Sequence, residues 1–182
     1  MNNVCIHIQT YEKHFTFANN LIHSLITNTN LKDLMLPIYV VFSTSNEKIK
    51  YENDYKYDYD NIRYASLSEV VNDTKLEVAE SYDELFKEVI KLKWGAGGHR
   101  NFVAVKRVYA ITYLHQKGYS HVWCLDSESL VLKFTDLNAL LGAQLSSPLL
   151  VVGVNNKTGP RYPMIVTELF GEQYGGKVKS IS

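Results

Sequence analysis

Asp126 and Glu128 directly follow the apolar run 121–125 and are separated by one residue, Ser127. If the extended backbone continues through these residues, the two carboxylates point to one side and Ser127 points to the other. Two carboxylates in one small volume repel each other, and a divalent cation removes this conflict by bridging them to phosphate oxygens. Because oxygen ligands favour Mg²⁺ or Mn²⁺ over zinc, Asp126 and Glu128 predict a site for one of these two metals.

The same acid-x-acid spacing occurs twice more, at Glu52/Asp54 and at Asp58/Asp60. Both pairs lie in a polar, tyrosine-rich segment that we interpret as a solvated loop. The pair 126/128 differs because it ends a buried strand, and ligands of open α/β sheets bind at the carboxyl ends of strands. Its alternative interpretation is a helix N-cap with a nearby acid.

Strands alternate with helices along the chain, which predicts a mostly parallel, three-layer α/β sheet. The strands are expected at 4–9, 38–42, 121–125 and 149–154, with a short one near 62–65. Apolar residues at helical spacing predict a helix over 15–26, and the nearly continuous apolar run 101–114 predicts a largely buried helix. Because the run 121–125 does not alternate, we expect a central strand covered on both faces.

Composition narrows the possible partners. The 182 residues hold 46% hydrophobic residues and 19 basic against 19 acidic side chains, so we expect one domain over 1–182, with a loose tail at 171–182. The balanced charge argues against nucleic acid as a partner.

The sequence predicts no signal peptide and no membrane span, hence a cytoplasmic protein. Cys5 and Cys124 lie in apolar runs and are expected to be reduced core thiols.

Two stretches of the chain resemble a known family. Gln9-Thr10-Tyr11 ends the first strand, and Gly97-Gly98-His99-Arg100-Asn101 precedes a helix, which is followed by Gly118 to Glu128 with its Asp-Ser-Glu ending. This order resembles the GT-A-type glycosyltransferases, with Asp-x-Glu in place of the commoner Asp-x-Asp. The resemblance implies a GT-A-like α/β/α fold with a mostly parallel, mixed central sheet and a Rossmann-like nucleotide-binding half.

The resemblance also implies roles for individual residues. Asp126 and Glu128 would contact the metal and the diphosphate of a nucleotide-sugar donor, UDP- or GDP-linked, and Ser127 would lie near its ribose. The resemblance further implies that Gln9, Thr10 and Tyr11 border the nucleotide base. Arg100 and Lys106 would contact the diphosphate or the sugar of the donor. The acceptor would be a carbohydrate hydroxyl. The expected function is therefore metal-dependent transfer of a sugar from a nucleotide-diphosphate sugar.

The basic residues have only partial support from the sequence itself. The glycine-rich turn 95–98 opens a helix whose N-terminal N–H groups can bind an anion, although it lacks the P-loop pattern. Arg100 and Arg107 share one helix face while Lys106 sits about 100° away, so all three cannot reach one site. Lys106 and Arg107 can equally be solvated breaks in a buried helix.

An inverting enzyme needs a carboxylate base near the acceptor hydroxyl, and we predict Glu168 for this role. Glu172 and Asp136 are alternative candidates for the base. A retaining enzyme would need no such base. The main alternative function is a non-catalytic nucleotide-sugar or protein-interaction module of the same fold. A sugar-1-phosphate nucleotidyltransferase ranks third, because 9–14 lacks a glycine-rich basic signature. We interpret the tyrosines of 51–64 as loop packing rather than a sugar cleft, and His14 as having no metal-ligand spacing.

Overall fold

The computed structural model describes residues 3–74, 98–146, 151–153 and 179–181. The strands are β1 (Val4–Thr10), β2 (Ile38–Phe42), β3 (Ile62–Ser66), β4 (His121–Asp126), β5 (Val151–Gly153) and β6 (Lys179–Ile181). The helices are the 3₁₀ turn η1 (Glu12–His14), α1 (Phe15–Asn28), α2 (Leu31–Leu34), α3 (Ser45–Asp54), α4 (Leu67–Thr74), α6 (Gly98–Gln116) and α7 (Leu137–Ser146). The chain divides into two compact units, 1–135 and 136–182.

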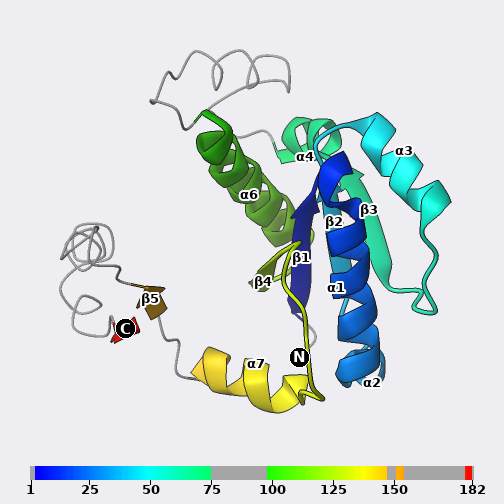
Figure 1. Cartoon of the computed structure of the whole chain (residues 1–182). Coiled ribbons are helices and arrows are strands. Elements are labelled where there is room, and N and C mark those ends of the chain that lie inside the picture. Colours follow the sequence, from blue (N-terminus) through cyan, green and yellow to red (C-terminus); the bar gives the residue numbers. More distant parts are fainter. Residues whose placement is uncertain (1–2, 75–97, 147–150, 154–178, 182) are drawn as a thin grey trace. The chain divides into compact units, whose positions relative to one another are not determined.

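The first unit is built on a four-stranded sheet in the order β3-β2-β1-β4, with every neighbouring pair parallel (Figure 1). The prediction of an α/β fold with a mostly parallel sheet is confirmed at this level. In the second unit, β5 and β6 form a separate parallel pair. The predicted strand 149–154 therefore exists at β5, but its partner is β6.

Helices cover both faces of the four-stranded sheet, as two neighbouring residues of β2 demonstrate. Phe42 packs against Phe15 of α1 and Tyr51 of α3, with ring centroids 5.8 and 5.1 Å away. Val41, which points to the opposite face, belongs to a core cluster with residues of α4 and α6, including Tyr109. The first unit is thus an α/β/α sandwich.

The sequence predictions for β4 and α6 need correction. Among the described strands of the first unit, β4 lies at one end of the order, and its residues 122–125 are only half-buried, so within these residues it is not the central, doubly covered strand that its apolar run predicts. In α6, Val108 is 57% exposed and Ile111 is 39% exposed, so the helix is not buried all round. Its core-facing side carries Tyr109, Ala110 and Leu114 instead.

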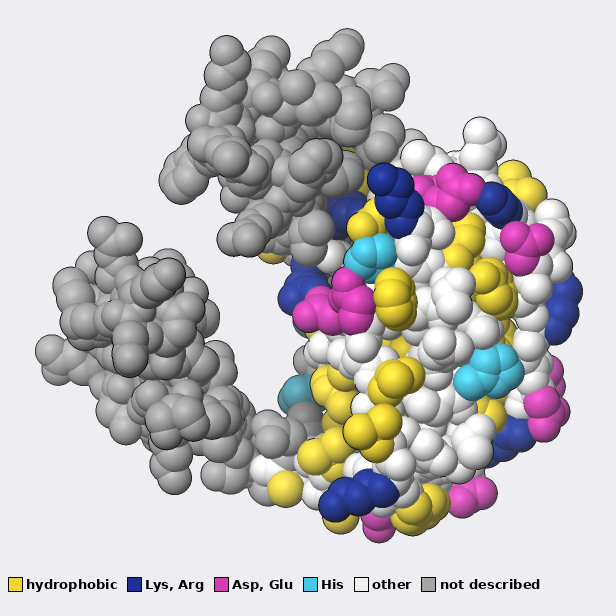
Figure 2. Space-filling view, in the orientation of Figure 1, with side chains coloured by type: hydrophobic (Ala, Val, Ile, Leu, Met, Phe, Trp, Pro, Cys, Tyr) yellow, Lys and Arg dark blue, Asp and Glu magenta, His cyan; other side chains and the backbone are white. Residues whose placement is uncertain are grey.

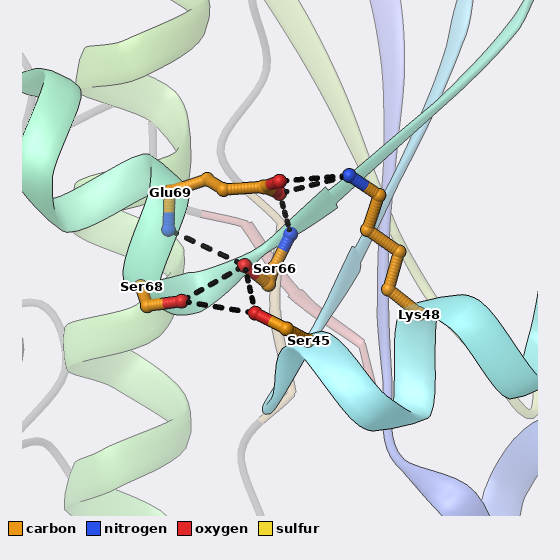
Figure 3. A network of polar contacts seen from close by, with 5 residues as sticks. All are labelled: Ser45, Lys48, Ser66, Ser68 and Glu69. Atoms are coloured by element: carbon orange, nitrogen blue, oxygen red, sulfur yellow. Dashed lines mark hydrogen bonds and ion pairs between the residues drawn. The ribbon is translucent and has the colours of Figure 1, made fainter.

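The helices that follow β2 and β3 begin side by side, and polar contacts connect their first turns (Figure 3). The hydroxyl of Ser45 contacts those of Ser66 and Ser68 at 3.2 and 3.4 Å. Glu69 accepts from the backbone N–H of Ser66 at 2.6 Å and from Lys48 Nζ at 2.8 Å. These contacts fix the spacing of α3 and α4 at the carboxyl edge of the sheet.

Candidate functional site

A pocket of about 540 Å³ opens at the carboxyl edge of the four-stranded sheet. We call it the carboxyl-edge pocket. Its lining residues are Gln9, Thr10, Tyr11, His14, Lys106, Asp126, Ser127 and Glu128. On the face shown in Figure 2, acidic, basic and histidine side chains adjoin one another. Seven of the residues that the sequence predicts as site residues are therefore brought together by the fold.

The position of this pocket follows from the sheet topology. The chain runs outward through β1, β2 and β3 and then returns to the other side of β1 to form β4. Ligands of open α/β sheets bind where the strand order reverses in this way. Gln9 pairs in register with Asp126, so β1 and β4 end at the same level and both contribute their last residues to the pocket.

The acidic triplet forms a tight turn instead of continuing the strand. The backbone N–H of Ser129 donates to the carbonyl of Asp126 at 2.9 Å, which closes the turn. Ser127 is buried, whereas the side chains of Asp126 and Glu128 are 66% and 54% exposed. The strand ends at Asp126, so the extended backbone does not continue through the triplet and Ser127 does not point away from the pocket. Both carboxylates line the same pocket, as expected.

Each carboxylate of the triplet has a cationic or histidine partner from a different element. Arg107 of α6 donates to Asp126 Oδ1 at 2.5 Å. His14 Nδ1 lies 3.0 Å from Glu128 Oε1. Because all these groups are partly exposed, water screens the pairs and their contribution to stability is small. The partners instead orient the carboxylates before a ligand enters.

His14 is the residue that sequence reasoning missed. Its Nδ1 also lies 3.2 Å from Ser127 Oγ, and its Nε2 lies 2.6 Å from the hydroxyl of Tyr11. A carboxylate only accepts, so the hydrogen between His14 and Glu128 is carried by Nδ1. The signal in the sequence was its position, three residues beyond Tyr11 and still in the loop at the end of the first strand.

Lys106 is a buried cation on the pocket wall, 5% exposed. Its Nζ donates to Ser43 Oγ, in the loop after β2, at 3.0 Å. Burial lowers the pKa of Lys106, and the nearby carboxylate of Glu47 opposes that shift. Lys106 is therefore not a solvated break in the helix. An anion in the pocket would further stabilise its charged form.

His7 lies deeper in β1, two residues before Gln9 on the same face of the strand. Its side chain is 1% exposed and interacts with the backbone of Tyr39, which is its register partner in β2. Burial, assisted by the positive charge of Arg107, lowers its pKa to about 4. His7 is therefore a neutral core residue at pH 7.

Cys5 and Cys124 form no disulfide in the structure. Cys5 is fully buried, and burial raises its pKa to about 12. Cys124 is half-buried, and burial also raises its pKa. Both groups remain protonated at neutral pH and are poor nucleophiles.

Glu47 connects the loops that follow β1 and β2. Its Oε2 accepts from the backbone N–H of Thr44 at 3.0 Å, and its Oε1 accepts from the backbone N–H of Glu12 at 3.1 Å. Thr44 in turn caps α3 by accepting from the N–H of Glu47, so the pair forms a capping box. The backbone around the carboxyl-edge pocket is thereby tied to the start of α3.

The donor set of the pocket fits a hard divalent cation only in part. Among the described residues, no three His, Cys, Asp or Glu side chains gather as a metal-binding group. Mg²⁺, however, is commonly bound by one or two carboxylates together with substrate phosphates and water. Asp126 and Glu128 meet that requirement, because both carboxylates are exposed and line one pocket.

Two predicted site residues stay outside this description. Arg100 lies in the first turn of α6, but its side chain falls outside the described part of the structure. Glu168, the predicted base, lies in 154–178, outside the described residues. Both remain predictions.

Comparison with known proteins leaves the site to be interpreted from its own geometry. No known protein family, curated protein or solved structure matches the chain. Among the helices described, none is both long and apolar enough to cross a membrane.

Proposed function

We propose that this chain is a metal-dependent glycosyltransferase domain that binds a nucleotide-diphosphate sugar in the carboxyl-edge pocket. One observation carries the proposal: the ends of β1 and β4, at the point where the strand order reverses, place Asp126 and Glu128 opposite Gln9, Thr10 and Tyr11 around about 540 Å³. This volume lies within the range of about 300–1,000 Å³ usual for small-molecule sites. The resemblance to GT-A-type enzymes supports the same assignment.

The charges around the pocket suit a diphosphate. Lys106 presents a buried ammonium, and Arg107 contributes a guanidinium that contacts Asp126. Desolvated cations interact more strongly with an incoming phosphate than solvated ones do. Gln9 and Thr10 at the end of β1, together with Tyr11 after it, would then border the nucleoside. Ser127 would lie near the ribose of the nucleoside.

Asp126 and Glu128 would hold the divalent metal, which supplies a positive charge beside the phosphate oxygens of the departing nucleoside diphosphate. Both carboxylates are already occupied by Arg107 and His14. Metal binding would therefore require these partners to turn away, and the guanidinium of Arg107 would then be free to bind the phosphates. Arg107 would thus serve as a counter-ion in the empty pocket and as a phosphate ligand in the filled one.

In the transfer itself, the acceptor hydroxyl oxygen forms a bond to the anomeric carbon and the bond from that carbon to the phosphate oxygen breaks. The hydroxyl proton passes to a base in an inverting enzyme, for which Glu168 is the prediction. The described residues contribute mainly by positioning the donor and by stabilising negative charge on the leaving group.

The test is calorimetric titration of UDP-, GDP- and dTDP-sugars into the chain, with Mn²⁺ and then with EDTA. We expect one nucleotide class to bind with Mn²⁺ and to bind at least about tenfold more weakly with EDTA. Asp126→Ala should abolish the metal dependence. Asp60→Ala is the matched control, because it removes an exposed acid outside the pocket.

The alternative is a non-catalytic nucleotide-sugar-binding module, and the ion pairs of Asp126 and Glu128 favour it. A pocket whose acids are already paired can bind a diphosphate through Lys106 and Arg107 without metal. Binding unchanged by EDTA, without sugar transfer or donor hydrolysis, would support this module. Absence of binding by every nucleotide sugar would refute both functions.

A further inference from the structure

A second pocket, of about 320 Å³, lies beside β3. We call it the tyrosine pocket. It is lined by Glu52, Tyr55, Lys56, Tyr57, Tyr59, Ile62 and Tyr64. None of these residues lines the carboxyl-edge pocket, and β3 is the strand farthest from β4 in the sheet. The two pockets are therefore separate sites of the same unit.

Tyr51, which is fully buried, holds the aromatic wall of this pocket in place. Its ring centroid lies 4.6 Å from that of Tyr55 and 6.2 Å from that of Tyr64. Its hydroxyl lies 2.6 Å from the hydroxyl of Tyr57. One core residue thus contacts three of the four tyrosines that line the pocket, so their rings are positioned before any ligand arrives.

The hydroxyls of the pocket tyrosines fall into two groups. Tyr57 donates to Asn19 Oδ1 at 3.0 Å and Tyr59 to the carbonyl of Leu36 at 2.5 Å, so both are used within the fold. The hydroxyls of Tyr55 and Tyr64 form no hydrogen bond with any described residue. They are available to a ligand. Burial and the carboxylate of Glu52 raise the pKa of Tyr64 to about 12, so its phenol stays protonated and can donate.

The charged groups of the tyrosine pocket balance each other. Glu52 contributes a carboxylate that can only accept, and Lys56 contributes an ammonium that can only donate. Lys56 Nζ is held by the backbone carbonyl of Glu52, one helical turn earlier in the chain. The pocket therefore offers aromatic rings, two phenol hydroxyls, one acceptor and one donor, with no net charge.

We propose that the tyrosine pocket binds a neutral sugar residue of a carbohydrate ligand. A pyranose has apolar C–H faces that pack on aromatic rings and a rim of hydroxyls that need both donors and acceptors. The pocket supplies both kinds of group at once. Free hydroxyls of a sugar would pair with Glu52, Lys56 and the phenols of Tyr55 and Tyr64.

A cationic ligand is the natural competitor, because tyrosines with a carboxylate can also form a cage for a quaternary ammonium group. Lys56 argues against it, since its ammonium lines the same pocket and would repel a second cation. The neutral balance of Glu52 and Lys56 is the feature that selects a hydroxyl-rich, uncharged ligand.

The sugar site goes beyond the proposed function and does not depend on it. Bound there, a carbohydrate would be held by the same unit that carries the carboxyl-edge pocket. It could be an acceptor chain or a glycan that only anchors the protein. In either case the binding involves no metal and no nucleotide.

The experiment is saturation-transfer NMR followed by titration, with free glucose, galactose, mannose, N-acetylglucosamine and xylose, and with choline as the cationic probe. We expect at least one sugar to bind with a Kd on the order of 1 mM, the range for so small a ligand. Tyr55→Ala should weaken binding about tenfold or more. Glu52→Gln, which keeps the side-chain shape, should weaken it severalfold.

Two controls keep the outcomes distinct. Asp54→Asn removes another acid of α3 that does not line the pocket, and it should leave the sugar Kd unchanged. Asp126→Ala should also leave it unchanged, so failure of the nucleotide-sugar proposal would not affect this result. The inference is overturned if no sugar binds, if choline binds in their place, or if Glu52→Gln and Tyr55→Ala bind sugar like the unaltered chain.

Discussion

The carboxyl-edge pocket lies where β1 and β4 end, whereas the tyrosine pocket lies beside β3, the strand farthest from β4. The two pockets are built in different ways. The first collects His14 of η1, Lys106 of α6 and the carboxylates of Asp126 and Glu128, and each of these side chains contacts a partner that a ligand can displace. The second is a set of rings fixed by a fully buried tyrosine. In the carboxyl-edge pocket, a ligand would be bound mainly by electrostatic interactions with side chains that can rearrange. In the tyrosine pocket, it would be bound mainly by packing against rings that are already fixed.

The sharpest test of this difference is Tyr51→Ala. Removing a fully buried aromatic side chain should lower the free energy of unfolding by about 4 kcal/mol, because it leaves a cavity against Phe15 and Phe42. Urea denaturation measures the change. Tyr51→Phe is the matched control and should lose only about 1 kcal/mol, for the hydroxyl contact with Tyr57. Equal losses in both variants would contradict the role of the ring.

Acid should affect the region beneath the carboxyl-edge pocket. His7 has a folded-state pKa of about 4 against an ordinary value of 6.5, so the unfolded chain binds its proton first as the pH falls. Stability should decline between about pH 6.5 and pH 4, by about 3 kcal/mol from this group. In His7→Leu the decline over that window should be smaller by this amount. Parallel pH profiles of unfolding for the two proteins would show that His7 is not the cause.

Asp126→Ala should separate binding from stability in the opposite way to Tyr51→Ala. The variant should bind its nucleotide sugar about 100-fold more weakly in Mn²⁺, since it loses half of the proposed metal site. Its unfolding free energy should change by no more than about 0.5 kcal/mol, because the pair with Arg107 is exposed. Calorimetry and urea denaturation give the two numbers. A large stability loss would mean that the ion pair is structural.

The smallest expected effect concerns the helix cap that supports the pocket backbone. Thr44→Ala removes the side chain that accepts from the N–H of Glu47, and it should lower the unfolding free energy by about 1 kcal/mol. Thr44→Ser keeps the acceptor oxygen and should retain most of that stability. If the serine variant loses as much as the alanine variant, the methyl group of Thr44 matters more than its cap.

The sequence predicted the elements well where a periodic pattern decides them. β1 was predicted from alternation, β2 from its run of β-branched and aromatic residues, and α1 from helical spacing. The α/β class follows from the order of these elements. The place of β4 in the sheet could not be predicted in this way. An apolar run indicates what covers the faces of a strand, but it does not indicate which strands lie beside it. Tyr51 was expected in a loop, although Thr44-x-x-Glu47 is a capping-box signal for the helix that contains it.

The site was predictable to the extent that strand ends define it. Asp126 and Glu128 were predicted because they end a strand of an α/β sheet, whereas Gln9, Thr10 and Tyr11 were implied by the resemblance to GT-A-type enzymes. The residues that contact the triplet were not predicted, because these contacts are made between elements far apart in the sequence. His14 reaches Ser127 across 113 positions of sequence, and Arg107 reaches Asp126 from a different element. No local spacing encodes such pairs.

The bridge made by Glu47 has a dynamic consequence. One carboxylate receives the amide of Glu12 on one oxygen and the amide of Thr44 on the other. Neither loop can swing away without releasing a charge-assisted hydrogen bond, and withdrawal of the carboxylate frees both amides together. The two protons should therefore exchange with deuterium at similar rates, and Glu47→Gln should speed both. The entrance to the carboxyl-edge pocket would then fluctuate as a single cooperative segment.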